Sequence, residues 1–208
     1  MEMLMDFFHR IYDVESLVRV GGLIGLTAIV FCETGLLIGF FLPGDSLLVT
    51  AGLFSARGDL SVSSLLISLS LAAILGDTLG YNIGARTGPK LFSRPDSWLF
   101  NRKHLLTTKE FYERHGPFTI VIARFVPIVR TFAPVVAGVG AMAYKRFIVY
   151  NVVGGIGWVL SMILGGFFLG HLVPNIHKNI DKVILVVIFL SLLPIIIKYL
   201  RDRKTRAA

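Results

Sequence analysis

Four ionisable residues stand inside long apolar stretches of this sequence: Glu33 and Asp45 near its start, and Arg124 and Arg130 near its middle. An arginine at the bilayer centre costs about 2.5–3.5 kcal/mol on insertion scales, so such charges mark functional sites by default. The planar guanidinium of arginine can bind a phosphate through two parallel hydrogen bonds. A carboxylate in a low-dielectric cavity binds a proton more readily than it does in water. These residue types therefore predict a site whose arginines bind an anionic phosphate headgroup and whose acids carry protons.

A structural network of ion pairs is the alternative interpretation, because two acids and two arginines can neutralise each other. Buried pairs stabilise poorly compared with apolar replacements, and helix breakers lie beside these charges, so a water-filled functional cavity is favoured. Asp77 is a weaker candidate for proton coupling, since an acid at such a position more often hydrogen-bonds a neighbouring helix.

The helix breakers accompany both charged stretches. Pro43 and Gly44 follow Glu33, and Pro127 and Pro134 flank Arg130. Proline removes a backbone donor, and broken backbone persists in lipid only where protein or a water-lined cavity satisfies it. We therefore predict two oppositely oriented re-entrant hairpins, over residues 21–56 and 118–142. Residues 21–42 would measure about 33 Å as one helix, so a full span is the alternative there.

With 54% hydrophobic residues, the chain is too apolar for a soluble domain. We expect an all-α polytopic membrane protein with about three full spans, over 62–85, 147–170 and 183–200. An amphipathic surface helix (1–20) precedes the single transmembrane domain (21–200), and a basic tail (201–208) follows it. Small residues four apart predict close packing of the first two spans: Gly76, Gly80, Gly84 and Gly88 on one, and Gly157, Ser161 and Gly165 on the other.

The two halves resemble an inverted repeat of the transporter type. Glu33 precedes Pro43 by ten residues, as Arg124 precedes Pro134, and one glycine-bearing span follows each hairpin. Lys and Arg concentrate in 86–115, 141–147 and 198–208, which we place in the cytoplasm with the C-terminus. Segments 1–20, 57–61 and 171–182 hold few and are placed outside.

Other functional classes have little support in the sequence. The net charge of +8 lies beside apolar spans without a nucleic-acid recognition motif. The single Cys32 and the five scattered histidines lack metal-ligand spacing, so we expect no metal and no cofactor. A lipid phosphatase would need a histidine near the arginines, and the hairpins contain none, so we expect no enzyme. Trp98 and Trp158 are interpreted as interface anchors or packing residues. An ion or proton antiporter remains the alternative, and a homo-oligomer remains open.

Four motifs resemble the bacterial DedA family over about residues 20–200. They read F-C-E-T-G-L-L-I-G-F-F-L-P-G-D-S-L-L, G-D-T-L-G-Y-N-I-G, F-Y-E-R-H-G and A-R-F-V-P-I-V-R-T-F-A-P-V-V-A-G. The resemblance implies a bacterial cytoplasmic membrane protein with the membrane domain of eukaryotic lipid scramblases, and links to proton motive force. It implies translocation of undecaprenyl phosphate or of phospholipids. The essential acids of the family match Glu33 and Asp45, and its essential arginines match Arg124 and Arg130.

Overall fold

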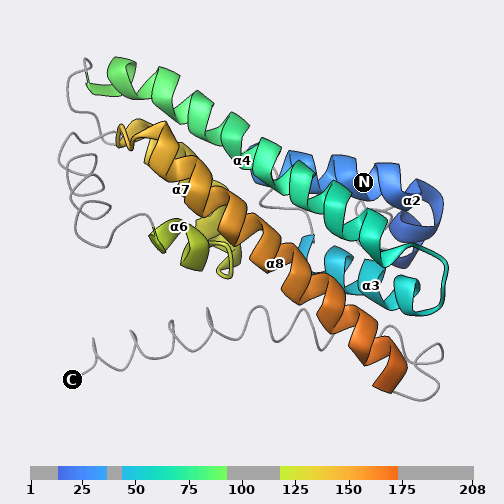
Figure 1. Ribbon diagram of the computed structural model, residues 1–208. Helices are drawn as coiled ribbons and strands as arrows, with labels where there is room; N and C mark the ends of the chain where they lie inside the picture. Colours follow the sequence, from blue (N-terminus) through green and yellow to red (C-terminus); the bar gives the residue numbers. More distant parts are fainter. Residues whose placement is uncertain (1–13, 37–43, 93–117, 173–208) are drawn as a thin grey trace, which may run out of the picture.

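The computed structural model describes residues 14–36, 44–92 and 118–172, and within these ranges every regular element is a helix. The all-α prediction is confirmed for this part of the chain. Figure 1 shows α4 and α8 as long rods, with α2 and α3 toward one end of the assembly and α6 and α7 toward the other. The helices are α2 (Val14–Gly35), α3 (Gly44–Ala56), α4 (Val62–Phe92), α6 (Phe118–Ala123), α7 (Pro127–Val139) and α8 (Tyr144–Leu172).

Two of these helices are long and apolar enough to cross a membrane, and they match two of the predicted spans. The apolar parts are Val62–Gly88 in α4 and Tyr144–Leu172 in α8, of 27 and 29 residues. At 1.5 Å per residue each is about 40 Å long, more than the hydrocarbon core of about 30 Å. Helix α4 continues to Phe92, so it extends past Arg86 and beyond the end of the span predicted over 62–85. The third predicted span, 183–200, lies outside the described residues.

The first apolar stretch is not one straight helix. Gly22 has φ 50° and ψ −152° inside α2, a left-handed backbone that glycine adopts without the steric cost of a side chain. The helix ends at Gly35, and its apolar part, Val20–Gly35, is shorter than a bilayer span. The single helix considered as an alternative for 21–42 is interrupted at Gly22 and ends at Gly35, and residues 37–42 lie outside the described part. Of the predicted surface helix, residues 1–13 lie outside the described part, and residues 14–20 open α2.

The glycines of α4 confirm close helix packing. A methyl group at Gly76 would overlap Thr34 on α2, and one at Gly84 would overlap the carbonyl oxygen of Val135 on α7. One at Gly88 would lie 3.1 Å from the Cα of Val139. The backbones of α2 and α7 can approach α4 this closely because no side chain stands between them.

The close packing predicted for the small residues four apart on α8 was wrong. Gly157 and Gly165 have nothing within 4 Å of the Cβ position, whereas a methyl group at Gly166 would overlap the carbonyl oxygen of Val49 on α3. Gly52 on α3 makes the reciprocal approach to the backbone at Ile163. Adjacent residues differ by about 100° around a helix. The small residues at intervals of four therefore share one face of α8, but that face does not contact α3.

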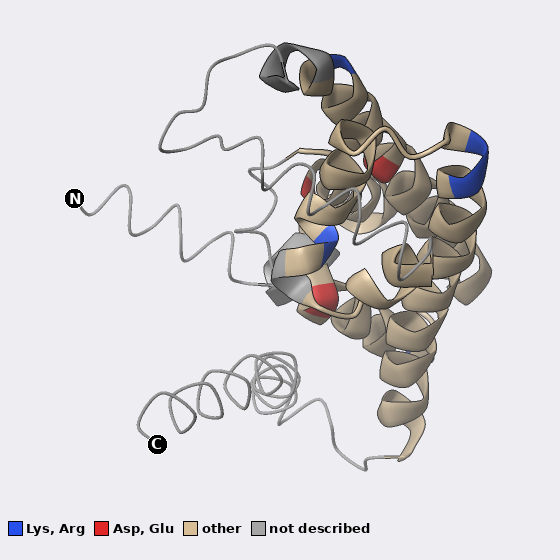
Figure 2. Cartoon of the chain, turned by 90° about the vertical axis from the view of Figure 1, so that its left-hand side faces the viewer, with Lys and Arg blue, Asp and Glu red and all other residues tan. Residues whose placement is uncertain are grey.

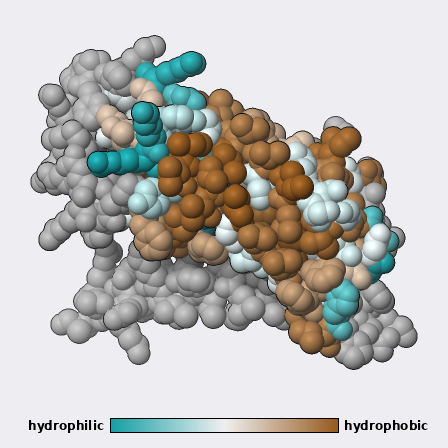
Figure 3. All heavy atoms as spheres, in the orientation of Figure 1, coloured by the Kyte–Doolittle hydropathy of each residue, from teal (hydrophilic) through white to brown (hydrophobic). Residues whose placement is uncertain are grey.

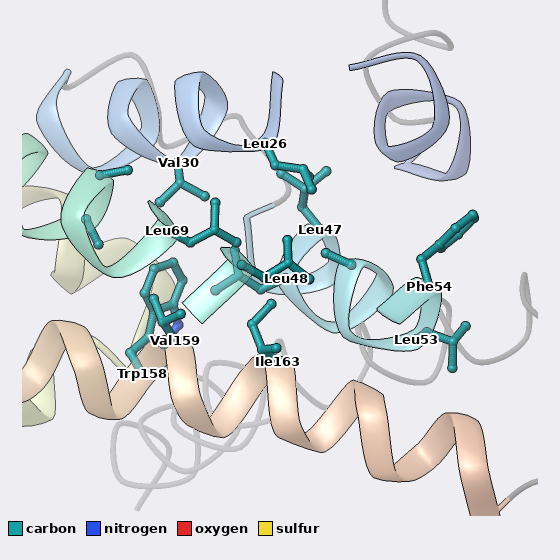
Figure 4. Packing of buried hydrophobic residues seen from close by; sticks show 14 residues of the cluster. Leu26, Val30, Leu47, Leu48, Leu53, Phe54, Leu69, Trp158, Val159 and Ile163 are labelled. Carbon is teal, nitrogen blue, oxygen red and sulfur yellow. The ribbon is translucent and has the colours of Figure 1, made fainter. Parts of the chain in front are cut away.

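The apolar residues divide between a core and an outer surface. Leu26, Leu47, Leu48, Leu69 and Ile163 pack together where α2, α3, α4 and α8 meet (Figure 4). Figure 3 shows a broad apolar outer face. Several large apolar side chains on α4 and α8 are more than half exposed, a pattern that suits helices facing lipid: Ile67, Leu71, Leu75, Val149, Val153 and Phe168.

Candidate functional site at two buried arginine clusters

The first cluster joins three helices through Arg130 on α7. Its Nη2 donates to Oε1 of Glu33 on α2, and its Nη1 donates to Oδ1 of Asp45 on α3. The side chains of Glu33 and Arg130 are 1% and 7% exposed, and that of Asp45 is 13% exposed. Asp45 is therefore the most accessible group of this cluster.

Gly44 explains how Glu33 reaches the cluster. Glu33 lies in the last turn of α2, and its carboxylate packs directly on Gly44, the first residue of α3. A methyl group at position 44 would overlap Oε2 of Glu33. The partial positive charge at the start of a helix also favours a carboxylate there. Glycine at this position therefore lets the acid lie against the N-terminus of α3. Pro43 lies outside the described residues.

The two prolines of the second stretch act differently. Pro127 is the first residue of α7 and follows the turn 124–126 that separates α6 from α7, as a helix-breaking residue should. Pro134 lies inside α7 and does not end it, so the breaking role predicted for Pro134 was wrong. Its ring removes the hydrogen bond that residue 134 would donate to the carbonyl of Arg130. Pro134 packs instead beside Gly80 on α4: its Cβ would lie 3.5 Å from a methyl group added at Gly80.

The second cluster surrounds Arg124, which lies in the turn between α6 and α7. Its Nη2 donates both to Oδ2 of Asp77 on α4 and to Oδ1 of Asn151 on α8. The amide nitrogen of Asn151 donates to the carbonyl of Ile74 at 3.1 Å, which fixes the orientation of that side chain. All three side chains of this cluster are buried.

Two glycines of α8 leave space for the side chain of Arg124. A methyl group at Gly154 would lie 3.2 Å from Cδ of Arg124, and one at Gly155 would lie 3.3 Å from Nη2. Larger residues at either position would push against the guanidinium. The arginine turn therefore packs directly on the backbone of α8.

The pairing differs from the simplest expectation. Glu33 and Asp45 both bind Arg130, so the acids of the first stretch do not neutralise one arginine each. Arg124 pairs instead with Asp77, which the sequence ranked as the weakest candidate. The structure thus brings all five predicted ionisable residues into two clusters.

Two members of the clusters were missed in the sequence. Asn151 is a single amide within the apolar run of α8, and such a residue is itself a signal that a polar partner lies opposite. Trp158 is fully buried: its indole N–H donates to Oδ1 of Asp45 at 2.9 Å, and its ring lies 4.8 Å from Cζ of Arg130. It is buried among the helices and is not an interface anchor. Trp98 lies outside the described residues.

The two clusters hold an excess of acid. Three carboxylates face two guanidiniums, so with every group ionised they carry one net negative charge. Figure 2 shows acidic and basic positions in the middle of the helical assembly as well as at its ends. An uncompensated buried charge is costly, whereas one bound proton makes the site neutral. Among the described residues, no three His, Cys, Asp or Glu side chains gather as metal ligands. The expected absence of a metal stays a prediction.

Comparison with known proteins places this chain in a family. Residues 42–168 match the VTT domain, and the chain is 47% identical to protein DedA of Escherichia coli K12. The chain belongs to the VTT-domain family of DedA proteins. The match to protein DedA extends over 184 residues, 88% of this chain and 84% of that protein. The part of the chain that is similar to protein DedA therefore includes both arginine clusters.

Other relatives carry membrane descriptions. An uncharacterized membrane protein of Mycobacterium tuberculosis H37Rv is 44% identical over 88% of this chain and 80% of its own length. Inner membrane protein YqjA of Escherichia coli K12 is 32% identical over 95% of this chain and 90% of its own. No solved structure matches the chain. With two helices of spanning length, this DedA-family chain is a membrane protein.

Proposed function

We propose that this protein is a lipid transporter that moves a lipid with a phosphate headgroup across the cytoplasmic membrane, coupled to or gated by protons. Undecaprenyl phosphate and phospholipids are the candidate substrates. The observation that carries the proposal is the Arg130 cluster, in which one phosphate-binding side chain is held by two acids. Because the two clusters together hold three acids and two arginines, one of the acids can carry a proton.

Proton and phosphate compete for Arg130 in this mechanism. With Glu33 and Asp45 ionised, both terminal nitrogens of the guanidinium are occupied. Protonation of Asp45 weakens its bond to Arg130, because a neutral acid loses the attraction between two opposite charges. An anionic headgroup can then take the place of the carboxylate. The lipid therefore binds when the proton is bound, and it leaves when the proton leaves.

Unused donors also support a phosphate ligand. Nε of Arg130 and Nε of Arg124 are buried and have no hydrogen-bond partner among the described residues. A buried donor without an acceptor costs about 1–3 kcal/mol, so each N–H favours an incoming oxygen. Arg124 is the second phosphate contact in this proposal, with Asp77 as its proton-carrying partner. Nothing in the mechanism requires a covalent step or a cofactor.

The proposed topology places the two clusters at membrane depth. Helices α3 and α7 have 13 residues each and α6 has 6, too few to span. We propose that α2 with α3, and α6 with α7, form two re-entrant hairpins that enter from opposite sides and belong to an inverted repeat. Lys145 and Arg146, at the start of α8, and the C-terminus then lie in the cytoplasm, and the turn at 57–61 lies outside.

The test is lipid movement by purified protein in liposomes, using labelled undecaprenyl phosphate and a labelled phospholipid, each with and without a pH gradient. We expect the wild type to move one of them and the gradient to change the rate. Asp45→Asn and Glu33→Gln preserve shape but remove ionisation, so both should abolish the effect of the gradient. Asp59→Asn, at an exposed turn residue, is the matched control and should behave as wild type.

Two results would contradict the proposal. Proton or ion flux without movement of either lipid would favour the antiporter alternative, in which effects on the envelope are secondary. Wild-type response to the gradient in both acid variants would reduce Glu33 and Asp45 to structural partners of Arg130.

A further inference from the structure

Trp158 contacts both charged partners of the ion pair between Asp45 and Arg130. Its indole N–H and Nη1 of Arg130 donate to the same oxygen, Oδ1 of Asp45. The ring also lies 4.8 Å from Cζ of that arginine, within the range of a cation–π interaction. One side chain of α8 therefore touches the carboxylate of α3 and the guanidinium of α7.

Packing alone does not account for a tryptophan at this position. Trp158 is fully buried beside apolar neighbours such as Leu48 and Ile163, where a leucine or phenylalanine would also exclude water. A buried indole N–H usually finds an acceptor, and here that acceptor is the side chain whose protonation the transport mechanism requires. A hydrogen bond to a charged group contributes more than one between neutral groups. The indole N–H therefore helps to hold the carboxylate of Asp45 in position.

We propose that Trp158 is a positioning residue of the transport site. Its N–H holds the ionised carboxylate of Asp45 on Arg130, and its ring keeps the guanidinium in place when a phosphate replaces that carboxylate. This role in transport rests on the proposed function, whereas the contact with Asp45 stands by itself. The charged groups around Asp45 are Glu33 from α2 and Arg130 from α7, with Asp77 of α4 and Arg124 in the neighbouring cluster.

A spectroscopic measurement tests the contact without any lipid transport. The chain has two tryptophans, so in Trp98→Phe protein the only indole signal belongs to Trp158. We expect the indole N–H resonance of isotope-labelled protein in nanodiscs to shift with pH as Asp45 gains a proton. Adding Asp45→Asn should remove that shift, and adding Asp59→Asn should retain it. A resonance that does not titrate, or that titrates equally in the Asp45→Asn protein, would overturn the proposal.

A transport measurement tests the role. Trp158→Phe keeps an aromatic ring but removes the N–H, and we expect it to lower the maximal rate of lipid movement about tenfold. Ile163→Val is the control, since it removes one methyl group from a fully buried residue in the same core and should lower the rate less than twofold. Equal losses in the two variants would reduce Trp158 to packing and overturn the role. A wild type that moves no lipid would refute the proposed function instead, and the resonance would still decide the contact.

Discussion

Asn151 and Trp158 lie seven residues apart on α8, and each hydrogen-bonds one of the two arginine clusters. Asn151 accepts from Arg124, and Trp158 donates to the acid that holds Arg130. Seven residues are close to two helical turns, so both side chains leave the same face of the helix. A single spanning helix therefore aligns two charged sites that come from separate parts of the chain, and a rotation of α8 would disturb both.

Neighbouring glycines of α8 should respond differently to the same substitution. Gly166→Ala places a methyl group on the carbonyl oxygen of Val49, so we expect a loss of about 1–3 kcal/mol in stability, typical of overpacking. Gly165→Ala meets open space and should be neutral or slightly stabilising, because alanine favours helix. Thermal unfolding of the purified proteins in one detergent measures the difference. The opposite order would show that α8 packs on α3 with its other face.

Gly44→Ala should damage the Arg130 cluster specifically. The added methyl group overlaps the carboxylate of Glu33, so that buried side chain must shift away from the start of α3. We expect a lower unfolding temperature and little lipid movement, while Gly157→Ala, at an open position on α8, should leave both unchanged. Wild-type behaviour of the Gly44→Ala protein would mean that Glu33 does not lie against the start of α3.

Lysine replacements separate phosphate binding from charge pairing. Arg124→Lys and Arg130→Lys keep the charge but lose the planar two-pronged contact. If the arginines bind phosphate, both variants should reach the membrane in normal amounts and move lipid slowly. Near-normal lipid movement in liposomes would show that a positive charge alone is sufficient.

The Arg124 cluster allows a direct measurement of the pair, since one acid faces one arginine. Arg124→Gln leaves Asp77 buried without its cation, a change that costs about 3–5 kcal/mol in comparable pairs. Adding Asp77→Asn removes the unpaired charge, so the double variant should unfold at a higher temperature than Arg124→Gln alone. Additive losses in the double variant would indicate that the two side chains do not interact.

The charge distribution makes a prediction about sidedness. Single cysteines at Ser61 and Ala143, in a Cys32→Ala background, lie in exposed turns at the starts of α4 and α8. Lys and Arg counts place the first turn outside and the second in the cytoplasm. An impermeant thiol reagent should therefore label Ser61→Cys in intact cells and should label Ala143→Cys only after the cells are opened. The reverse pattern would invert the topology.

The sequence by itself determined the class of protein, the ionisable residues of the candidate site and most helix locations. Apolar stretches of about 25 residues predict α4 and α8, because hydrophobic length is a property of the chain alone. The motifs around Glu33, Asp77 and Arg124 identified the family. Charged residues in apolar surroundings identified the site, because their desolvation must be offset wherever they lie.

Only the tertiary structure decided which charges meet. The pairing of Arg124 with Asp77, and of Arg130 with two acids, depends on how each helix is rotated about its axis. One residue of offset is about 100°, which is why Gly166 and not Gly165 faces α3. Trp158 had no sequence signal that distinguished it from a packing residue. Its role follows from contacts between helices that lie far apart in the chain, and local periodicity does not encode such contacts.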